Sequence, residues 1–147
     1  MAWKIEVSES SLSISEKVNH SFIKRVAAFA LSKTGFKNGT LSIGLVNRRE
    51  MRKLNKRYRG EDKVTDVISL PLGSDKKNKK IETYWGEVIV CPSVAKKQAH
   101  LFKNTFREEI ARLIVHGILH IAGYNHKTPY DAKRMFGLTD KIIKKFS

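Results

Sequence analysis

Three of the chain's five histidines lie close together in the stretch VHGILHIAGYNH, which spans residues 115–126. His116 and His120 have the spacing of one helical turn, so on a helix their imidazoles can reach the same ion. Gly123 stands where a helix commonly ends in a left-handed conformation, which reverses the chain and brings His126 back toward the same point. A lone histidine on an apolar helix is more often a packed core residue, but this double spacing favours a metal site with His116, His120 and His126 as ligands.

The ligand types indicate which metal to expect. Three imidazoles without a cysteine favour zinc, one ion per chain, although iron, nickel and copper bind the same nitrogens. Three protein ligands leave the fourth position of a tetrahedral zinc open, as in catalytic sites. The spacing is similar to the H-x-x-x-H-x-x-G-x-x-H pattern of the metzincin zinc peptidases, but Gly117 stands where those enzymes carry a glutamate general base. The missing glutamate therefore argues against a peptidase.

Hydrophobic periodicity predicts the elements that must position these histidines. The pattern is typical of a mixed α/β (α+β) fold, a small mixed four-stranded sheet packed by about five helices, with the histidines on a zincin-like helix. Strands are expected at 2–7, 41–46, 64–70 and 84–90. Helices are expected at 15–33, 47–58, 92–103, 107–121 and 129–145. Thr105 and Glu108 have the spacing of a capping box before the histidine helix.

Length and composition favour one domain over residues 1–147, because no repeat or Pro- or Ser-rich linker marks a boundary. The polar, lysine-rich stretch 73–82 is expected to form an exposed loop between two strands. No apolar run approaches the roughly 20 residues of a membrane helix, and the N-terminus lacks the pattern of a signal peptide. Cys91 is the only cysteine, so no internal disulfide can form. We therefore expect a cytoplasmic protein without a membrane partner.

Charge points to a polyanionic partner. The chain has 29 Lys and Arg residues against 14 Asp and Glu residues, a net charge of +15. Such surfaces also occur for solubility or in heat-stable proteins, so charge alone names no chemistry. The basic residues expected to attract a nucleic-acid strand are Arg48, Arg49, Arg52, Lys53, Lys56 and Arg57. The aromatic candidates for stacking on bases, each at least as compatible with a scaffold role, are Tyr58, Tyr84, Trp85 and Tyr124.

The motifs together resemble one known family. The block H-G-x-L-H-x-x-G-Y-N-H is similar to the H-G-x-L-H-x-x-G-Y-D-H signature of the YbeY family of bacterial metal-dependent endoribonucleases. Two more blocks fit: Leu54-Asn55 and Tyr58-Arg59 followed by T-D-V-I-S-L-P at 65–71, and W-G-E-V-I-V at 85–90. The resemblance covers about residues 41–146. It implies a single-strand-specific endoribonuclease acting in 3′-end maturation of 16S ribosomal RNA and in ribosome quality control, with the small ribosomal subunit as partner.

The resemblance also assigns catalytic roles to Arg59 and His116. The planar fork of Arg59 suits a bidentate phosphate contact, whereas composition alone would make it one more surface charge. The chain departs from the family pattern at several positions: Val64 for proline, Leu70 for phenylalanine, Glu87 for aspartate, Asn125 for aspartate, and KTPYDAK for an acidic run. Asn125 puts in doubt any role of an acidic group beside His126. A non-catalytic RNA-binding protein of ribosome assembly with a structural zinc stays open as the main alternative.

Overall fold

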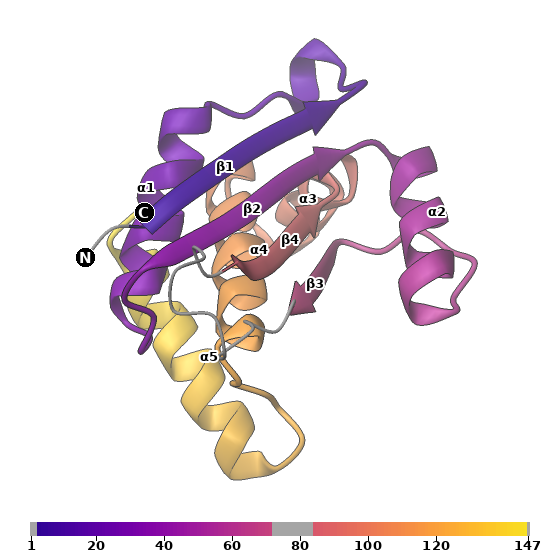
Figure 1. The fold of residues 1–147 in the computed structure, drawn as a ribbon. Coiled ribbons are helices and arrows are strands. Elements are labelled where there is room, and N and C mark those ends of the chain that lie inside the picture. Colours follow the sequence, from indigo (N-terminus) through magenta and orange to yellow (C-terminus); the bar gives the residue numbers. More distant parts are fainter. Residues whose placement is uncertain (1–2, 72–83, 147) are drawn as a thin grey trace.

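The computed structural model describes residues 3–71 and 84–146, and these form a four-stranded sheet with helices on both faces (Figure 1). The strand order is β1-β2-β4-β3. β1 (Trp3–Ser10), β2 (Gly39–Val46) and β4 (Tyr84–Val90) are parallel, and β3 (Val67–Pro71) runs antiparallel to β4. The mixed sheet and the mixed α/β class are thus confirmed. The lysine-rich stretch 73–82 lies outside the described residues.

The α-helices are α1 (His20–Ser32), α2 (Arg48–Arg59), α3 (Pro92–Phe102), α4 (Phe106–Ile121) and α5 (Pro129–Lys144). A short 3-10 helix, η1 (Ile14–Glu16), precedes α1. None of the helices among the described residues combines the length and the apolar character needed to cross a membrane. The five expected helices are therefore present, with differences at their ends.

Two elements begin three or more residues later than expected, and side chains explain both. The first helix begins at His20 rather than near residue 15, because the Asn19 side chain accepts a hydrogen bond from the Phe22 backbone N–H at 3.0 Å and caps the helix there. The third strand begins at Val67 rather than at residue 64. Asp66 directs its carboxylate to the Val67 backbone N–H at 2.7 Å, while its carbonyl accepts the Cys91 N–H at 2.9 Å.

Apolar side chains form one hydrophobic cluster on each face of the sheet. The larger cluster joins the sheet to α1 and α4, which lie behind it in Figure 1. The smaller cluster packs α2 over β3 and β4 through Met51, Ile68 and Ile89. Because successive strand residues point to opposite faces, Ile68 faces α2 while Val67 and Ser69 face α4. β3 therefore presents one side to the helix that carries the histidines.

Candidate metal centre

The histidine helix begins and ends as its sequence predicts. Thr105 and Glu108 form a reciprocal capping box at the start of α4. At the other end, Gly123 has a φ of 100°, and the Tyr124 N–H donates to the Leu119 carbonyl at 2.9 Å. The Gly123 N–H bonds the His120 carbonyl at 3.0 Å, which completes a Schellman motif. The chain reverses at this motif and returns toward the helix it has just left.

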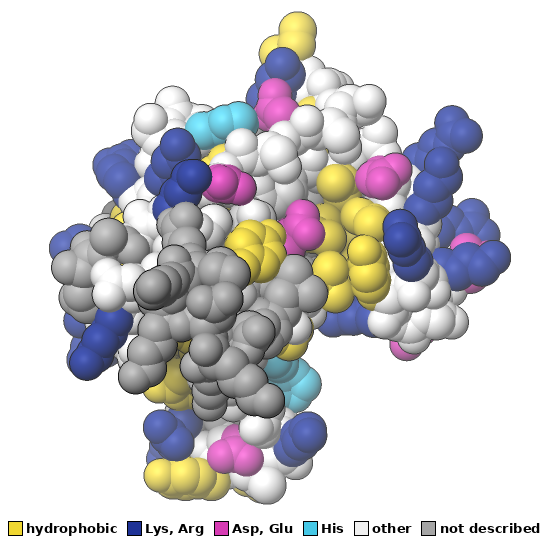
Figure 2. Space-filling model, viewed as in Figure 1, with side chains coloured by type: hydrophobic (Ala, Val, Ile, Leu, Met, Phe, Trp, Pro, Cys, Tyr) yellow, Lys and Arg dark blue, Asp and Glu magenta, His cyan; other side chains and the backbone are white. Residues whose placement is uncertain are grey.

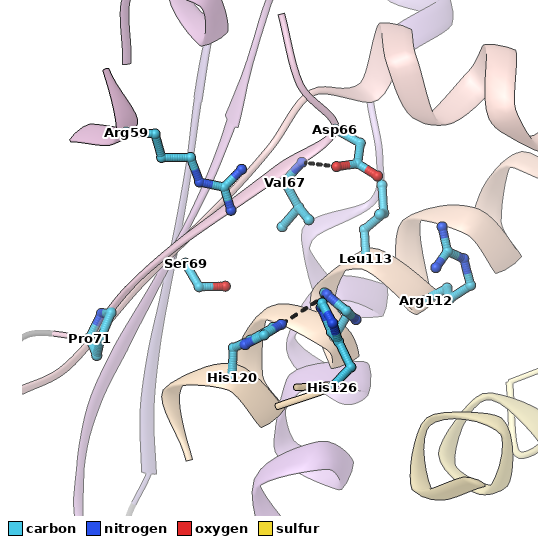
Figure 3. Close-up of a pocket in the computed structure, with 10 residues that line it drawn as sticks. Arg59, Asp66, Val67, Ser69, Pro71, Arg112, Leu113, His120 and His126 are labelled. Carbon is cyan, nitrogen blue, oxygen red and sulfur yellow. Dashed lines mark hydrogen bonds between the residues drawn. The ribbon is translucent and has the colours of Figure 1, made fainter. Parts of the chain in front are cut away.

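The reversal brings the three histidines together. A ligand-capable atom of each of His116, His120 and His126 lies within 4.8 Å of those of the other two. The Nε2 atoms of His116 and His120 are 3.1 Å apart (Figure 3). His116 and His120 are partly buried, whereas His126 is exposed. The structure thus assembles the nitrogen cluster that the spacing predicts, and a divalent cation fits its donor set.

The cluster forms one wall of a cavity of about 420 Å³. β3 supplies a second wall through Val67, Ser69 and Pro71, the residues on its α4-facing side. Arg59 approaches from the side of the cavity opposite His120 and His126 (Figure 3). The remaining lining residues are Asp66, Arg112 and Leu113. Sequence segments far apart therefore converge on one concave site.

Arg59 is positioned by the way α2 ends. The inner face of α2 is anchored by Met51 and Asn55, both fully buried. The Asn55 side-chain amide donates to the Lys63 carbonyl at 2.9 Å and so holds the segment that leads into β3. Gly60, with a φ of 72°, ends the helix directly after Arg59. The last residue of α2 is thereby fixed at the rim of the cavity.

The electrostatics of the site favour neutral imidazoles. Burial lowers the pKa of His116 to about 4, with further lowering by His120 and Arg112. Burial also lowers the pKa of His120, as do the charges of His126 and Arg59. A neutral imidazole keeps a free lone pair, which is the form that binds a metal ion. At neutral pH the two helical histidines are thus already in the metal-binding form.

Three charged residues near the histidines were missed by sequence reasoning. Arg112 lies one turn before His116, and its Nε donates to both carboxylate oxygens of the fully buried Glu109, at 3.0 and 3.2 Å. This hydrogen bond raises the pKa of Arg112. Asp66 also accepts a hydrogen bond from the Gln98 side chain at 3.2 Å, besides the one from the Val67 N–H. The sequence did contain a signal for two of them, because Glu109 and Arg112 have helical spacing to His116 and so share a helix face with it.

Gly117 explains why no acidic residue follows the first histidine. A Cβ atom built there would lie 2.6 Å from Val88 Cγ1 and 3.2 Å from Ser69 Oγ. The position faces the sheet at close range rather than the metal centre, and Ser69 Oγ donates to the Gly117 carbonyl at 3.3 Å. A glutamate here has neither room nor access to the histidines. The general base of a metzincin peptidase therefore has no counterpart at this position.

The basic residues of α2 lie outside the histidine cavity. A second, more open hollow of about 470 Å³ is lined by Arg48, Arg49, Arg52, Lys53 and Lys56 together with Asp62 and Val64. Arg52 pairs with Asp62 at 2.8 Å, and the Arg57 guanidinium lies 5.5 Å from the Tyr58 ring centre. All six predicted RNA-attracting residues are exposed on the helix that ends at Arg59. Their predicted role in attracting RNA stays a prediction, because the hollow that five of them line is separate from the histidine cavity.

The aromatic candidates divide into surface and scaffold residues. Tyr58 is 49% exposed, at the end of α2. Trp85 is a core residue, stacked on Phe36 with ring centres 4.6 Å apart, which removes it from the stacking candidates. Tyr84 donates its hydroxyl to Ser42 across the sheet at 2.7 Å, and Tyr124 packs against the core beside the Schellman turn. Of the four candidates, Tyr58 is therefore the one whose ring is exposed.

A mixed α/β fold with a three-histidine cluster at the end of a core helix defines a protein with a cavity whose histidines could hold a metal ion. Residues 4–147 match the family described as Endoribonuclease YbeY. The chain is 41% identical over 134 residues to the Endoribonuclease YbeY of Sulfurihydrogenibium sp. (strain YO3AOP1), covering 90% of this chain and 87% of that protein. It is 38% identical to that of Aquifex aeolicus, covering 89% and 86%.

A solved structure agrees with these sequence matches. The solution structure of TM1509 from Thermotoga maritima superposes with a TM-score of 0.64 at 28% identity, covering 95% of this chain and 87% of that one. The chain belongs to the YbeY family, and the resemblance stated from its motifs is confirmed.

Proposed function

We propose that this protein is a zinc-dependent endoribonuclease that hydrolyses single-stranded RNA in the cytoplasm. The observation that carries the proposal is the convergence of three histidines and Arg59 on one cavity. Membership of a family named for endoribonuclease activity supports the reaction class. Its substrate in the cell is proposed to be the 3′ end of 16S ribosomal RNA on the small ribosomal subunit, which the family resemblance supports.

His116, His120 and His126 would hold the metal, and three nitrogen ligands without sulfur suit zinc. When bound, zinc supplies an activated water and a Lewis acid for a phosphate oxygen. Burial keeps His116 and His120 unprotonated, so no proton has to leave these two ligands at neutral pH. His116 is the ligand whose pKa burial lowers to about 4, so its imidazole is neutral at physiological pH.

Arg59 supplies the positive charge that phosphodiester hydrolysis requires. Charge grows on the phosphoryl oxygens as the water attacks, and a planar guanidinium can bind two of them at once. Arg59 is free to do so because it is exposed at the rim, whereas Arg112 is committed to Glu109. Because its guanidinium is bound to Glu109, Arg112 cannot make a bidentate contact with a phosphate of the strand. Its proposed role is to supply a fixed positive charge beside His116.

The basic face of α2 would guide the strand to this point. Its six cations lie on the helix that ends at Arg59, and contacts with phosphates release counterions and draw the strand in. The cavity is lined by β3, by α4 and by Arg59 at the end of α2, and we expect it to accept single-stranded rather than duplex RNA.

The test is cleavage of end-labelled single-stranded RNA and of its duplex by purified protein, with and without a chelator. Cutting of the single strand, lost with chelator and restored by zinc, is expected, and His120→Ala should remove both zinc and activity. RNA binding without cutting by zinc-loaded protein would instead favour the non-catalytic assembly protein. Hydrolysis of a casein substrate would favour a peptidase, against which the packing of Gly117 already argues.

A further inference from the structure

A second surface, directly beside the metal centre, combines exposed aromatic rings with positive charge. Tyr130 is 69% exposed and Phe136 is 48% exposed, both on α5, which starts at the lower end of the molecule in Figure 1. Lys133 lies one turn from each of them and is exposed, as is Arg134. Figure 2 shows hydrophobic, basic and acidic side chains together at this lower end. We call Tyr130, Lys133, Arg134 and Phe136 the α5 platform.

The α5 platform touches the candidate metal centre through Phe136. The Phe136 ring lies nearly parallel to the His126 imidazole, at an interplanar angle of 11° and a centroid distance of 6.2 Å. The phenyl ring therefore lies beside a predicted metal ligand in an offset parallel arrangement, while nearly half of the Phe136 side chain stays open to solvent. A planar group stacked on the exposed part of Phe136 would therefore lie next to the histidine cluster.

Charge on the α5 platform suits a polyanion. The Arg134 guanidinium lies 5.5 Å from the Tyr124 ring centre and 5.8 Å from that of Tyr130, so it joins the two rings and stays exposed. Lys127, at the turn after His126, adds another exposed cation. Asp131 is the acidic residue in the first turn of α5, against three cations nearby. Exposed rings between cations are what a nucleobase followed by its phosphate requires.

We propose that the α5 platform binds an unpaired nucleobase of the RNA strand by stacking, next to the phosphate held at the metal centre. The proposal rests on the proposed function and extends it: Arg59 and the basic face of α2 hold the strand on one side of the cavity, and the α5 platform holds a base on the other. Stacking is available only to an unpaired base, because a base inside a duplex is already stacked on both faces. The α5 platform would thus select single strands.

The test compares two strands that differ only in whether their bases can stack. The probes are an oligouridylate of roughly ten nucleotides, within the usual site size, and the same strand made of dihydrouridine. Dihydrouridine keeps the charge and sugar but has a puckered, non-aromatic base. Single-turnover cleavage at increasing enzyme concentration separates the half-saturating concentration from the limiting rate. The variants are Tyr130→Ala and Phe136→Leu, and Phe102→Ala serves as control because Phe102 is an aromatic residue of α3 that is 66% exposed.

Each platform variant should raise the half-saturating concentration for oligouridylate about 5- to 150-fold, the range for one stacked base. It should leave the dihydrouridine strand unchanged, and Phe102→Ala should affect neither strand. If Tyr130→Ala and Phe136→Leu have the same half-saturating concentration for oligouridylate as wild type, and wild type still cuts the strand, the stacking proposal is overturned while the proposed function stands. Equal losses on both strands also overturn it, because they indicate a structural or purely electrostatic role.

Failure of the proposed function and loss of zinc can both be told apart from failure of the stacking proposal. If wild-type protein neither binds nor cuts either strand, the proposed function fails, and the α5 platform is then better explained as a protein-docking surface. Because Phe136 touches His126, zinc content is measured in every variant. Should Phe136→Leu lose zinc, Tyr130→Ala decides the question, since the Tyr130 ring lies beside the Arg134 guanidinium.

Discussion

Adding a single methyl group at Gly117 should do more harm than its helical position suggests. In the interior of a helix, replacing glycine by alanine ordinarily stabilises by about 1 kcal/mol. At Gly117 the new Cβ would lie 2.6 Å from Val88 Cγ1 and 3.0 Å from Val88 Cγ2. Val88 is fully buried in the sheet and β-branched, so its side chain cannot rotate away. Relief must come from a shift of α4 away from β4.

The size of the effect follows from these distances. Ordinary van der Waals contact begins near 3.4 Å, so the clash with Val88 amounts to about 1 Å of overlap. Overpacking of a core by a methyl group costs about 1 to 3 kcal/mol, against the ~1 kcal/mol gained by helix propensity. We expect a net loss of about 0 to 2 kcal/mol in the free energy of unfolding. A shift of α4 also moves His116 and His120 relative to β3, and a misplacement of about 1 Å can cost roughly 100-fold in rate.

The assay pairs urea unfolding with single-turnover RNA cleavage for Gly117→Ala. Gly137→Ala is the matched control, because Gly137 lies in α5 with no atom within 4 Å of a built Cβ. That control should gain about 0.5 to 1 kcal/mol and cut RNA normally. Combining Gly117→Ala with Val88→Ala should restore part of the lost activity, since the clashing methyls are gone. If Gly117→Ala proved as stabilising as Gly137→Ala, with unchanged cleavage, the argument that close packing places the metal centre would be wrong.

Three further perturbations test the electrostatics. Arg59→Lys keeps the charge but loses the planar fork, so the single-turnover rate should fall about 30- to 1,000-fold, or roughly 2 to 4 kcal/mol, with zinc content unchanged; equal rates would reduce Arg59 to a surface charge. RNA affinity should fall linearly with salt on a double-logarithmic plot, and a flat dependence would contradict RNA binding through the basic face of α2. Burial raises the pKa of Glu87 above its ordinary 4.5, so the ionised carboxylate destabilises the folded state at neutral pH. Glu87→Gln should therefore raise the free energy of unfolding at pH 7, and the gain should vanish below the unfolded pKa, where both states are protonated; a gain that is equal at acid pH would refute this cause.

Local signals in the sequence were sufficient to predict the histidine helix. Its capping box, its apolar face and the glycine that ends it are all short-range features, and the structure follows them. Arg59 could be singled out only by the family resemblance, because its approach to the cavity depends on how α2 packs against the far face of the sheet. Asp66 and Arg112 depend on contacts with Gln98 and Glu109 that no periodicity reveals.

The wrong start of α1 has a different cause. Val18 continues the helical spacing of Phe22 and Val26, which suggested that the helix began before it. In the structure Val18 is 8% exposed and belongs to the main core, but it enters the core from the segment before the helix. Hydrophobic spacing indicates which residues are buried but not the backbone conformation that buries them. Here Val18 in the extended segment lies four residues before Phe22, which is also the spacing of Phe22 and Val26 in the helix. The Asn19 cap was the signal that separates them.

Asn125 stands where the family pattern has an aspartate. The asparagine keeps the hydrogen bond that an aspartate side chain can make here, but it lacks the negative charge. Its side-chain oxygen accepts the Lys127 backbone N–H at 3.0 Å, an Asx turn that fixes the loop carrying His126. A carboxylate oxygen makes the same hydrogen bond, so the substitution leaves the placement of the third histidine intact. What is lost is a negative charge beside a cavity that also holds Arg59 and Arg112. A cavity without that charge repels phosphate less.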